Sequence, residues 1–292
     1  MNNLNDYKVW TAIVTPMLDD GKIDFESFGH LLKLQVEAGN ALTVLGSTGE
    51  ALSFSLEEKK RILDFVIGQK LNIPIKVGVG GIYLPDQISW IEYLNTIPVD
   101  AYLVPVPYYT KPGKIGQTGW FRSLLNISDR PVCIYNVPGR TAVKLDVEAL
   151  RDISSHDNFW AVKEASGSVN SFKAYSEASP NAHMLSGDDP MFAQFSRLGA
   201  KGVVSVAANV WPEQTQLIAR QFMSGNFENE EIFSIASKSL FSASNPIPTK
   251  SILNHLGNIE TPTVRPPLSA KDMMGLDQIV AIDKELTNIT NV

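Results

Sequence analysis

Short apolar runs alternate with amphipathic segments along most of the chain. Eight runs rich in aliphatic and β-branched residues have the length of strands; they span residues 9–14, 41–45, 73–79, 101–106, 131–137, 159–162, 183–185 and 202–206. Most are apolar at successive positions, as in parallel strands that are covered on both faces. Their starts recur at an interval close to the roughly 30 residues that a strand and its following helix need.

Between the runs, apolar residues recur at helical spacing with polar residues on the opposite side. Phe28 and Leu31 belong to one such segment and Ile62 to the next. Ser55 and Glu58 form a capping-box pattern at the start of the second helix. The alternation predicts a parallel sheet. Eight units without an evident linker before residue 224 favour a closed (β/α)₈ TIM barrel over an open sheet, which usually has five or six strands.

Past residue 225 the alternation stops. Residues 228–243, 248–256 and 269–286 read as helices that are joined by proline-rich turns. We therefore expect a catalytic barrel over residues 1–224 and a C-terminal helical appendage over residues 225–292. Every residue singled out below as catalytic precedes this appendage, so we do not expect it to be a separate catalytic domain.

Composition narrows the class of protein. The 292 residues are 44% hydrophobic and 19% charged, which is ordinary for a globular protein and excludes a disordered or fibrous one. The net charge of −6, without any run of Lys or Arg, disfavours nucleic acid as a partner. No apolar stretch reaches the roughly 18 residues of a membrane span, and the first residues lack a secretory pattern. We expect a cytoplasmic protein whose single cysteine, Cys133, is a buried thiol.

Polar and aromatic residues follow five of the predicted strands directly. Catalytic groups of TIM barrels lie at the carboxyl ends of the strands, so these segments are expected to meet on one rim. They are Gly-Ser-Thr-Gly-Glu at 46–50, Pro-Tyr-Tyr at 107–109, Tyr-Asn-Val-Pro-Gly-Arg-Thr at 135–141, Lys-Glu-Ala-Ser-Gly at 163–167 and Ser-Gly-Asp-Asp at 186–189.

Lys163 follows an apolar run at the mouth of the predicted barrel. Partial desolvation there disfavours the charged form and leaves a nucleophilic amine. Such an amine forms a Schiff base with a keto acid, which activates the acid as a carbon nucleophile without a metal or other cofactor. Position alone leaves a second interpretation equally open, in which Lys163 pairs with Glu164 or with a surface carboxylate.

Hydroxyl groups near Lys163 are candidates for proton transfer. Tyr135 could relay protons with Ser47 and Tyr109, although half-buried tyrosines with solvated hydroxyls are the more common finding. The glycine-rich segment at Ser47 offers backbone N–H groups that could hold a carboxylate. Arg140 could grip a carboxylate with two hydrogen bonds or lie solvated on the surface.

Two other kinds of site are not supported by the sequence. The four histidines, at positions 30, 156, 183 and 255, are far apart and match no metal-ligand pattern. The glycines at 78, 80 and 81 lack the spacing of a dinucleotide-binding loop, and we interpret them as sites of close packing. We therefore expect neither a catalytic metal nor a cofactor.

These segments, with Gly-Val-Val-Ser-Val at 202–206 and Asn-Pro-Ile-Pro at 245–248, resemble the dihydrodipicolinate synthase family. This family of pyruvate-dependent barrel enzymes includes N-acetylneuraminate lyase. The resemblance covers nearly the whole chain, and the Arg140-Thr141 and 245–248 segments are closer to the synthases. It implies a homotetramer, a dimer of dimers, that condenses pyruvate with L-aspartate 4-semialdehyde on the route to diaminopimelate and lysine.

The resemblance also implies roles for individual residues. Lys163 would form the imine with pyruvate, and Tyr135 would donate and accept protons. Ser47 and Tyr109 would complete the relay, with Tyr109 reaching in from a neighbouring subunit. The remaining roles are in binding: pyruvate would be held by Thr48 and the backbone of Val204, and the carboxylate of the second substrate by Arg140.

The chain departs from the family pattern at two places. Ser47 stands where synthases usually have threonine, which keeps the hydroxyl but loosens its rotamer. Lysine-inhibited members carry histidines at the positions of Leu56 and Lys59 and asparagine at that of Ile82. A cation and two apolar side chains suit a lysine ligand poorly, so we expect weak or absent inhibition by lysine.

Two other functions stay open at this point. One is an aldolase of the same family that cleaves N-acetylneuraminate or another keto-sugar acid; the pair Ser47-Thr48 is more typical of the lyase, whereas the Arg140 segment opposes this assignment. The other is a non-catalytic protein that senses a keto acid, which the intact set of Lys163, Tyr135 and Tyr109 argues against.

Overall fold

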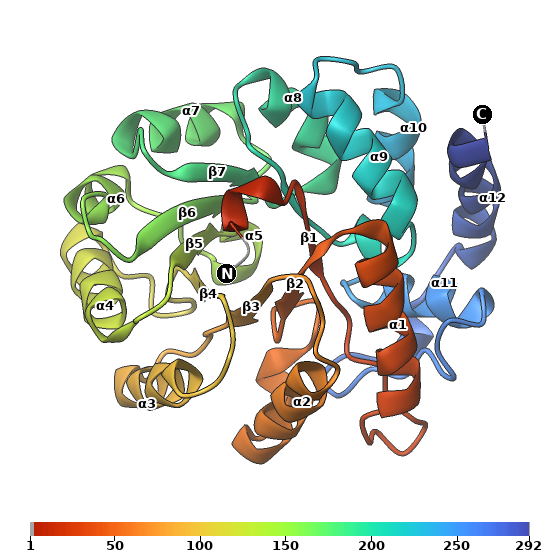
Figure 1. Ribbon diagram of the computed structural model, residues 1–292, viewed down its shortest axis with the longest axis horizontal. Helices are drawn as coiled ribbons and strands as arrows, with labels where there is room; N and C mark the ends of the chain where they lie inside the picture. Colours follow the sequence, from red (N-terminus) through yellow and green to blue (C-terminus); the bar gives the residue numbers. More distant parts are fainter. Residues whose placement is uncertain (1–2, 292) are drawn as a thin grey trace.

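The computed structural model describes residues 3–291, and its centre is a closed barrel of eight parallel strands (Figure 1). Each strand pairs with its neighbours in the sequence, and the last pairs with the first. The strands are β1 Val9–Ala12, β2 Ala41–Val44, β3 Ile75–Gly78, β4 Ala101–Pro105, β5 Val132–Asn136, β6 Phe159–Glu164, β7 His183–Ser186 and β8 Val203–Ser205. The predicted TIM barrel is confirmed, with all eight strands at the expected places.

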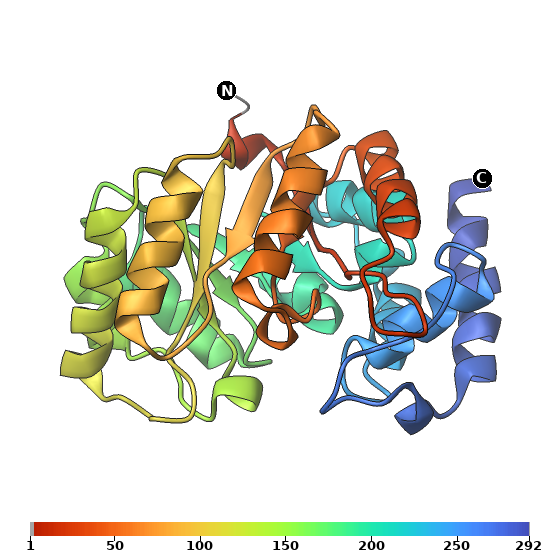
Figure 2. The same ribbon diagram turned by 90° about the horizontal axis from the view of Figure 1, so that it is seen from below.

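Helices surround the barrel and continue after it (Figures 1 and 2). The α-helices are α1 Phe25–Ala38, α2 Leu56–Gly68, α3 Leu84–Asn95, α4 Lys114–Ile127, α5 Pro138–Thr141, α6 Val147–Ile153, α7 Val169–Ala178, α8 Phe192–Arg197, α9 Pro212–Met223, α10 Glu230–Ser239, α11 Ile247–His255 and α12 Leu276–Thr287. Short 3₁₀ turns are η1 Leu4–Asp6, η2 Ala51–Ser53, η3 Asp189–Met191, η4 Ala207–Asn209, η5 Ala270–Asp272 and η6 Asn288–Asn291. Among the described residues no helix is both long and apolar enough to cross a bilayer.

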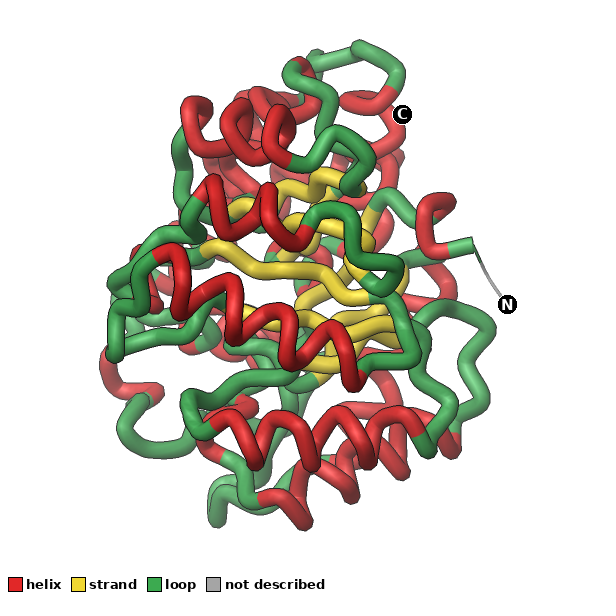
Figure 3. The backbone as a smooth tube through the Cα atoms, turned by 90° about the vertical axis from the view of Figure 1, so that its left-hand side faces the viewer, coloured by secondary structure: helices red, strands yellow, loops and turns green. Residues whose placement is uncertain are grey.

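Helix α2 begins where the sequence predicts its cap. The Ser55 hydroxyl accepts from the backbone N–H of Glu58, and the Glu58 carboxylate accepts from that of Ser55, which is the predicted capping box. α2 then buries Ile62 and Leu63 against the barrel. Figure 3 shows helices of this kind as an outer layer around the strands.

β6 is longer than the sequence pattern predicts. The pattern ended this strand at residue 162, but it continues through Glu164. Lys163 pairs with Tyr135 of β5 on one side and with Leu185 of β7 on the other. Both neighbours supply ladder hydrogen bonds, so the strand extends over two polar residues that are buried in the finished barrel.

The barrel interior is a cluster of side chains separate from the larger core between strands and helices. Large residues such as Trp10 and Tyr135 share this space with small ones such as Ala12 and Ala161. Cys133 is a free, buried thiol within it, as predicted. Burial raises the pKa of this thiol, so it is protonated and inert.

The helices beyond the barrel differ in detail from the predicted ones. α10 ends at Ser239, earlier than residue 243, and the predicted helix over 269–286 is two pieces, η5 and α12. Gly275, with φ of 73°, caps the start of α12 in a left-handed conformation. In Figures 1 and 2, α11 and α12 lie beside the barrel on the side of α1 and α9.

A buried ion pair ties α11 to the loop that follows β2. Lys250 Nζ lies 2.6 Å from Glu50 Oε1, with side-chain exposures of 0% and 2%. Lys250 also donates to the Thr263 carbonyl, and the second oxygen of Glu50 accepts from the backbone N–H of Arg265. Each charge therefore has a partner of the opposite charge and a backbone partner, which offsets the desolvation of both.

We expect Lys250→Met to destabilise the fold by roughly 3–5 kcal/mol, because it leaves the Glu50 carboxylate buried without its cation. The midpoint of urea unfolding measures the loss. The double variant Glu50→Gln/Lys250→Met should recover part of it, and replacement of the exposed Lys271 by Met should change little. A single variant as stable as the parent would contradict this account of the pair.

Candidate active site

A cavity of about 410 Å³ opens at the carboxyl ends of the strands. Its walls come from the loop after β2, from β5, β6 and β7 with their following loops, and from the region around α10. They include Ser47, Thr48, Tyr135, Arg140, Lys163, Asp188, Lys238, Phe241 and Asn245. A second hollow of about 360 Å³ adjoins it and shares Ser47, Tyr135, Val137 and Arg140.

Lys163 projects into this cavity from β6 and is 5% exposed. Its Nζ lies 4.1 Å from the centre of the Tyr135 ring on β5. Burial lowers the pKa of Lys163 to about 8, and the positive charge of Arg140 acts in the same direction. Cys133 and the carboxylates of Asp188 and Asp189 oppose this shift. A substantial fraction of this amine is therefore neutral near physiological pH.

Tyr135 is a buried phenol that stays protonated. Burial raises its pKa to about 12, while Arg140 and a side-chain hydrogen bond with Ser47 act in the opposite direction. The hydrogen bond places the hydroxyl of Ser47 next to the phenol, at the point where both cavities meet. Two of the predicted relay residues are thus in contact within one chain.

The absence of a side chain at Gly187 leaves room for the side chain of Lys163. A Cβ atom at this position would lie 2.7 Å from Lys163 Cγ and 2.8 Å from its Cε. Any larger residue would displace the lysine side chain, since its stem is enclosed at this point. The glycine after β7 is therefore a requirement for the position of the amine.

Two adjacent carboxylates follow β7. Asp189 is buried, and one of its oxygens accepts from the backbone N–H groups of Val206 and Ala207 at 2.8 and 3.1 Å. Asp188 lines the cavity, and burial followed by the charge of Asp189 raises its pKa to about 6. Asp189 thus fixes the loop after β8, while Asp188 faces the space in front of Lys163.

Residues that are far apart in the sequence hold the cavity wall around Thr48 in place. Asn245 Nδ2 donates to Thr48 Oγ1 at 2.9 Å, and Arg140 Nη2 donates to the Asn245 carbonyl at 3.2 Å. Asn245 precedes α11 in the C-terminal region, so this region supplies part of the cavity. Sequence reasoning did not assign Asn245 a role, although the segment at 245–248 and the two aspartates at 188 and 189 were visible as motifs.

The hydrogen bonds of Glu164 go to residues other than Lys163. Its carboxylate accepts from Asn136 Nδ2 at 2.7 Å and from the backbone N–H of Ser166 at 2.9 Å. Burial raises the pKa of Glu164, and these hydrogen bonds act against that shift. In the described structure, an ion pair between Lys163 and Glu164 does not form; the carboxylate instead fixes β5 to the segment after β6.

Two predicted residues lie outside the cavity. Tyr109 is 84% exposed, in a left-handed conformation with φ of 66°, and lines neither hollow. Val204 is buried in the barrel interior, where β8 pairs it with Trp10 of β1. The structure therefore brings together Ser47, Thr48, Tyr135, Arg140 and Lys163, as the shared rim predicts.

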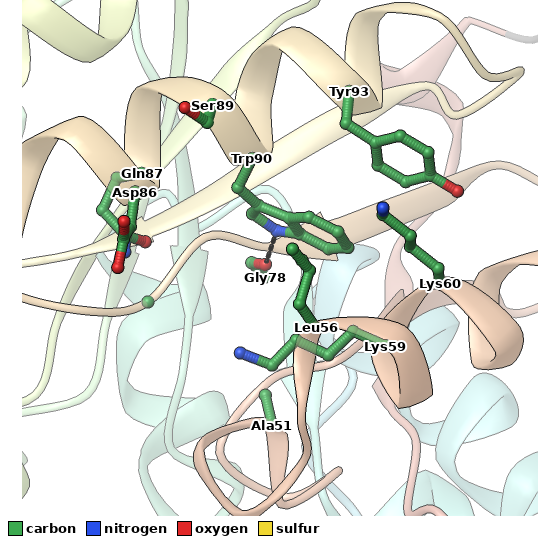
Figure 4. A pocket seen from close by; sticks show the side chains of 11 residues that line it. Ala51, Leu56, Lys59, Lys60, Gly78, Asp86, Gln87, Ser89, Trp90 and Tyr93 are labelled. Atoms are coloured by element: carbon green, nitrogen blue, oxygen red, sulfur yellow. Dashed lines mark hydrogen bonds between the residues drawn. The ribbon is translucent and has the colours of Figure 1, made fainter.

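A different pocket, of about 460 Å³, lies between α2 and α3 (Figure 4). Leu56 and Lys59 reach into it from α2, and Trp90 faces them from α3, with its indole N–H donating to the Gly78 carbonyl at 3.1 Å. Burial lowers the pKa of Lys59. Ile82 is half exposed and is not among the lining residues.

Grouped metal ligands are absent from the part of the chain that the structure describes: no three or more His, Cys, Asp or Glu side chains are arranged to hold an ion. The polar groups of the rim are instead hydroxyls, amines, a guanidinium, the amide of Asn245 and the single carboxyl group of Asp188. Such a set is suited to binding an anionic carbonyl compound and to moving protons around it.

Several proteins that are similar to this chain share one enzyme name. The 4-hydroxy-tetrahydrodipicolinate synthase of Francisella tularensis subsp. novicida (strain U112) is 43% identical over 278 residues, 94% of each protein. The enzyme of that name from Wolbachia pipientis subsp. Culex pipiens (strain wPip) is 42% identical over 287 residues, 96% of this chain and 98% of that one.

A solved structure shows the same architecture. The chloride-inhibited dihydrodipicolinate synthase from Acinetobacter baumannii, crystallised with pyruvate, superimposes with a TM-score of 0.90 at 30% identity, over 96% of this chain and 99% of that one. The model of the dihydrodipicolinate synthetase family matches residues 6–286. With a barrel of eight strands, a buried lysine on β6 and a match over nearly its whole length, the chain belongs to the dihydrodipicolinate synthetase family.

Proposed function

We propose that this protein is a 4-hydroxy-tetrahydrodipicolinate synthase, which condenses pyruvate with L-aspartate 4-semialdehyde through a Schiff base on Lys163. The observation that carries the proposal is the buried amine of Lys163 against the Tyr135 ring, in a cavity that also holds Arg140. The names of the relatives support the same reaction.

The pKa of about 8 suits Lys163 to attack a ketone. At pH 8 about half of this amine is neutral, against roughly 0.3% for an ordinary lysine. The neutral amine adds to the keto carbon of pyruvate, and loss of water from the adduct gives the iminium. Removal of a proton from the methyl group then gives an enamine, whose carbon attacks the aldehyde of the second substrate.

Tyr135 supplies and takes back the proton that these steps need. With a pKa of about 12 it begins protonated and donates to the hydroxyl that leaves the adduct as water. Ser47, through its hydrogen bond with Tyr135, is the next group in the relay. Serine in place of threonine keeps this contact, so the relay is expected to operate with a freer hydroxyl.

Residues at the rim of the cavity would bind the carboxylates of the two substrates. Thr48, which is ordered by Asn245, would hold the carboxylate of pyruvate. Val204 lies in the barrel interior and not among the lining residues, so the structure gives no support to the role that the resemblance implied for its backbone. Arg140 lines both hollows and would bind the carboxylate of the semialdehyde. The protein carries a net charge of −6, so attraction of two anionic substrates must come from such local groups rather than from the overall field.

Tyr109 takes part in this scheme only if another copy of the chain lies against the barrel rim. Its exposure of 84% leaves the phenol free to enter the site of a neighbour. We therefore propose the homotetramer, a dimer of dimers, in which Tyr109 extends the relay from Tyr135 and Ser47 of the adjacent subunit. Its cellular place would be the cytoplasm, as for other biosynthetic enzymes.

The reaction is tested by incubating the protein with pyruvate and one of two aldehydes. We expect aspartate semialdehyde to be consumed and N-acetylmannosamine to be left unchanged, and the reverse result would favour the lyase.

Borohydride reduction with pyruvate should add one pyruvate-derived group to the peptide that contains Lys163, because only an imine is reduced to a stable adduct. A Lys163→Met variant is the control, and a wild-type protein without an adduct would contradict both enzymatic functions.

Gly187→Ala should lower kcat/KM by roughly 10²-fold, since displacement of a catalytic group by about 1 Å costs that much. The added methyl group meets the stem of Lys163. The matched control is Gly139→Ala on the same rim, where a Cβ meets nothing within 4 Å. Steady-state kinetics and the yield of the reduced adduct measure the effect. Equal kinetics in the two variants would show that Gly187 does not position the lysine.

Lysine at millimolar concentration should leave most of the activity intact, because Lys59 repels its ammonium group and Leu56 offers no hydrogen-bond acceptor. Substitution of Leu56 and Lys59 by His, with Ile82→Asn, should increase the sensitivity. Initial rates over a lysine series measure both proteins. A steep loss of the wild-type activity at lysine concentrations below about 1 mM would contradict the prediction.

A further inference from the structure

The barrel interior contains a second lysine that the proposed reaction does not use. Lys76 projects inward from β3, and its side chain is completely buried. In the described part of the chain, its Nζ has no hydrogen-bond partner and no carboxylate within ion-pair distance. A fully buried lysine without a carboxylate is rare, since the cost of desolvating its charge is large.

Two indole rings take the place of the missing carboxylate. Lys76 Nζ lies 4.3 Å from the ring centre of Trp10 on β1 and 5.5 Å from that of Trp160 on β6. The two rings are themselves 5.5 Å apart. The electron-rich faces of both rings attract a cation and retain the charged amine in an apolar space.

Lys76 and Lys163 share one apolar interior. Lys76 stands between Thr43 of β2 and Ala101 of β4 in the register, and Lys163 stands between Tyr135 of β5 and Leu185 of β7. The charge of Lys163 acts on Lys76, and Cys133 interacts electrostatically with both amines. Burial lowers the pKa of Lys76 to about 8, which leaves it mostly charged at pH 7.

The titratable groups around the two amines come from several elements. Lys76 is near three such groups, which are Cys133 of β5, Lys163 of β6 and His183 of β7. Lys163 is near five, which are Tyr135, Cys133, Arg140, Asp188 and Asp189. Burial lowers the pKa of His183 to about 4, so this ring is neutral near pH 7. Arg140 is therefore the cation, and the aspartates are the anions, that act on Lys163 from the cavity side. The repulsion between Lys163 and Lys76 acts from the barrel interior, and because a Coulomb interaction is mutual it disfavours the charge on both amines.

We propose that Lys76 is a positioning residue for the proposed reaction: its ammonium, held by Trp10 and Trp160, disfavours a second positive charge on Lys163 and keeps that amine nucleophilic. The inference rests on the proposed role of Lys163 in forming the imine. Arg140 exerts a similar effect from the substrate side, but its charge is neutralised when it binds a carboxylate. Lys76 is enclosed in the barrel, so its influence persists when substrate is bound.

The test is the pH dependence of imine formation in a Lys76→Met variant. The rate of trapping pyruvate on Lys163 with cyanoborohydride is measured from pH 6 to 10 by mass analysis of the labelled peptide. Loss of the charge at Lys76 should move the midpoint of the rise in rate upward by roughly one pH unit. Trapping at pH 7 should fall by roughly tenfold and return to the wild-type rate at pH 10.

Two further variants separate charge from packing. Lys76→Arg retains a positive charge and should leave the midpoint unchanged or lower it. His183→Leu alters the packing on Trp160, whose ring stacks on His183 at 5.9 Å, without removing a charge at neutral pH, and should leave the midpoint in place. Should Lys76→Met fail to fold, Lys76→Leu removes the same charge and must show the same upward shift.

The outcomes distinguish this inference from the proposed function. A wild-type protein without an adduct on Lys163 overturns both. An adduct in wild type and in Lys76→Met with the same midpoint overturns the inference alone. A rate that falls equally at every pH also overturns it, since a merely structural role would lower trapping throughout.

Discussion

A closed barrel of eight short parallel strands must be filled by its own side chains, and this constraint governs the rest of the molecule. Strands that are covered by helices outside and by each other inside leave no place for solvent. Large residues such as Trp10 share this interior with small ones such as Ala41, its register neighbour, and Ala161. A polar group placed in such a space has few partners, so its protonation state responds strongly to burial.

The same constraint gives the site its chemistry. The carboxyl ends of the strands converge on one rim, where Lys163 is enclosed enough to lose charge readily and yet lies on the wall of a cavity. Tyr135 responds in the opposite direction, because burial penalises its anion. One apolar environment thus prepares a free amine and an intact phenol side by side, without a metal ion or cofactor being required for that pairing.

The sequence predicted the strands well because their apolar runs are buried on both faces. It ended β6 too early, since Lys163 and Glu164 are polar residues whose burial depends on neighbouring strands. It placed Ser47, Tyr135 and Lys163 on one rim by topology alone. The hydrogen bond between Asn245 and Thr48 joins residues 197 positions apart, and no local pattern records such a contact. Lys76 lies inside a predicted strand and is distinguished only by the rings that surround it.

The bond between Asn245 and Thr48 has a consequence for the order in which the molecule is built. The barrel strands are complete by Ser205, but the wall of the cavity lacks Asn245, and the loop after β2 lacks its anchor at Lys250. All eight strands can therefore be present in a growing chain whose cavity wall still lacks Asn245. The site reaches its final shape only after the segment from Asn245 to Lys250 has been synthesised and has packed against the loop that follows β2.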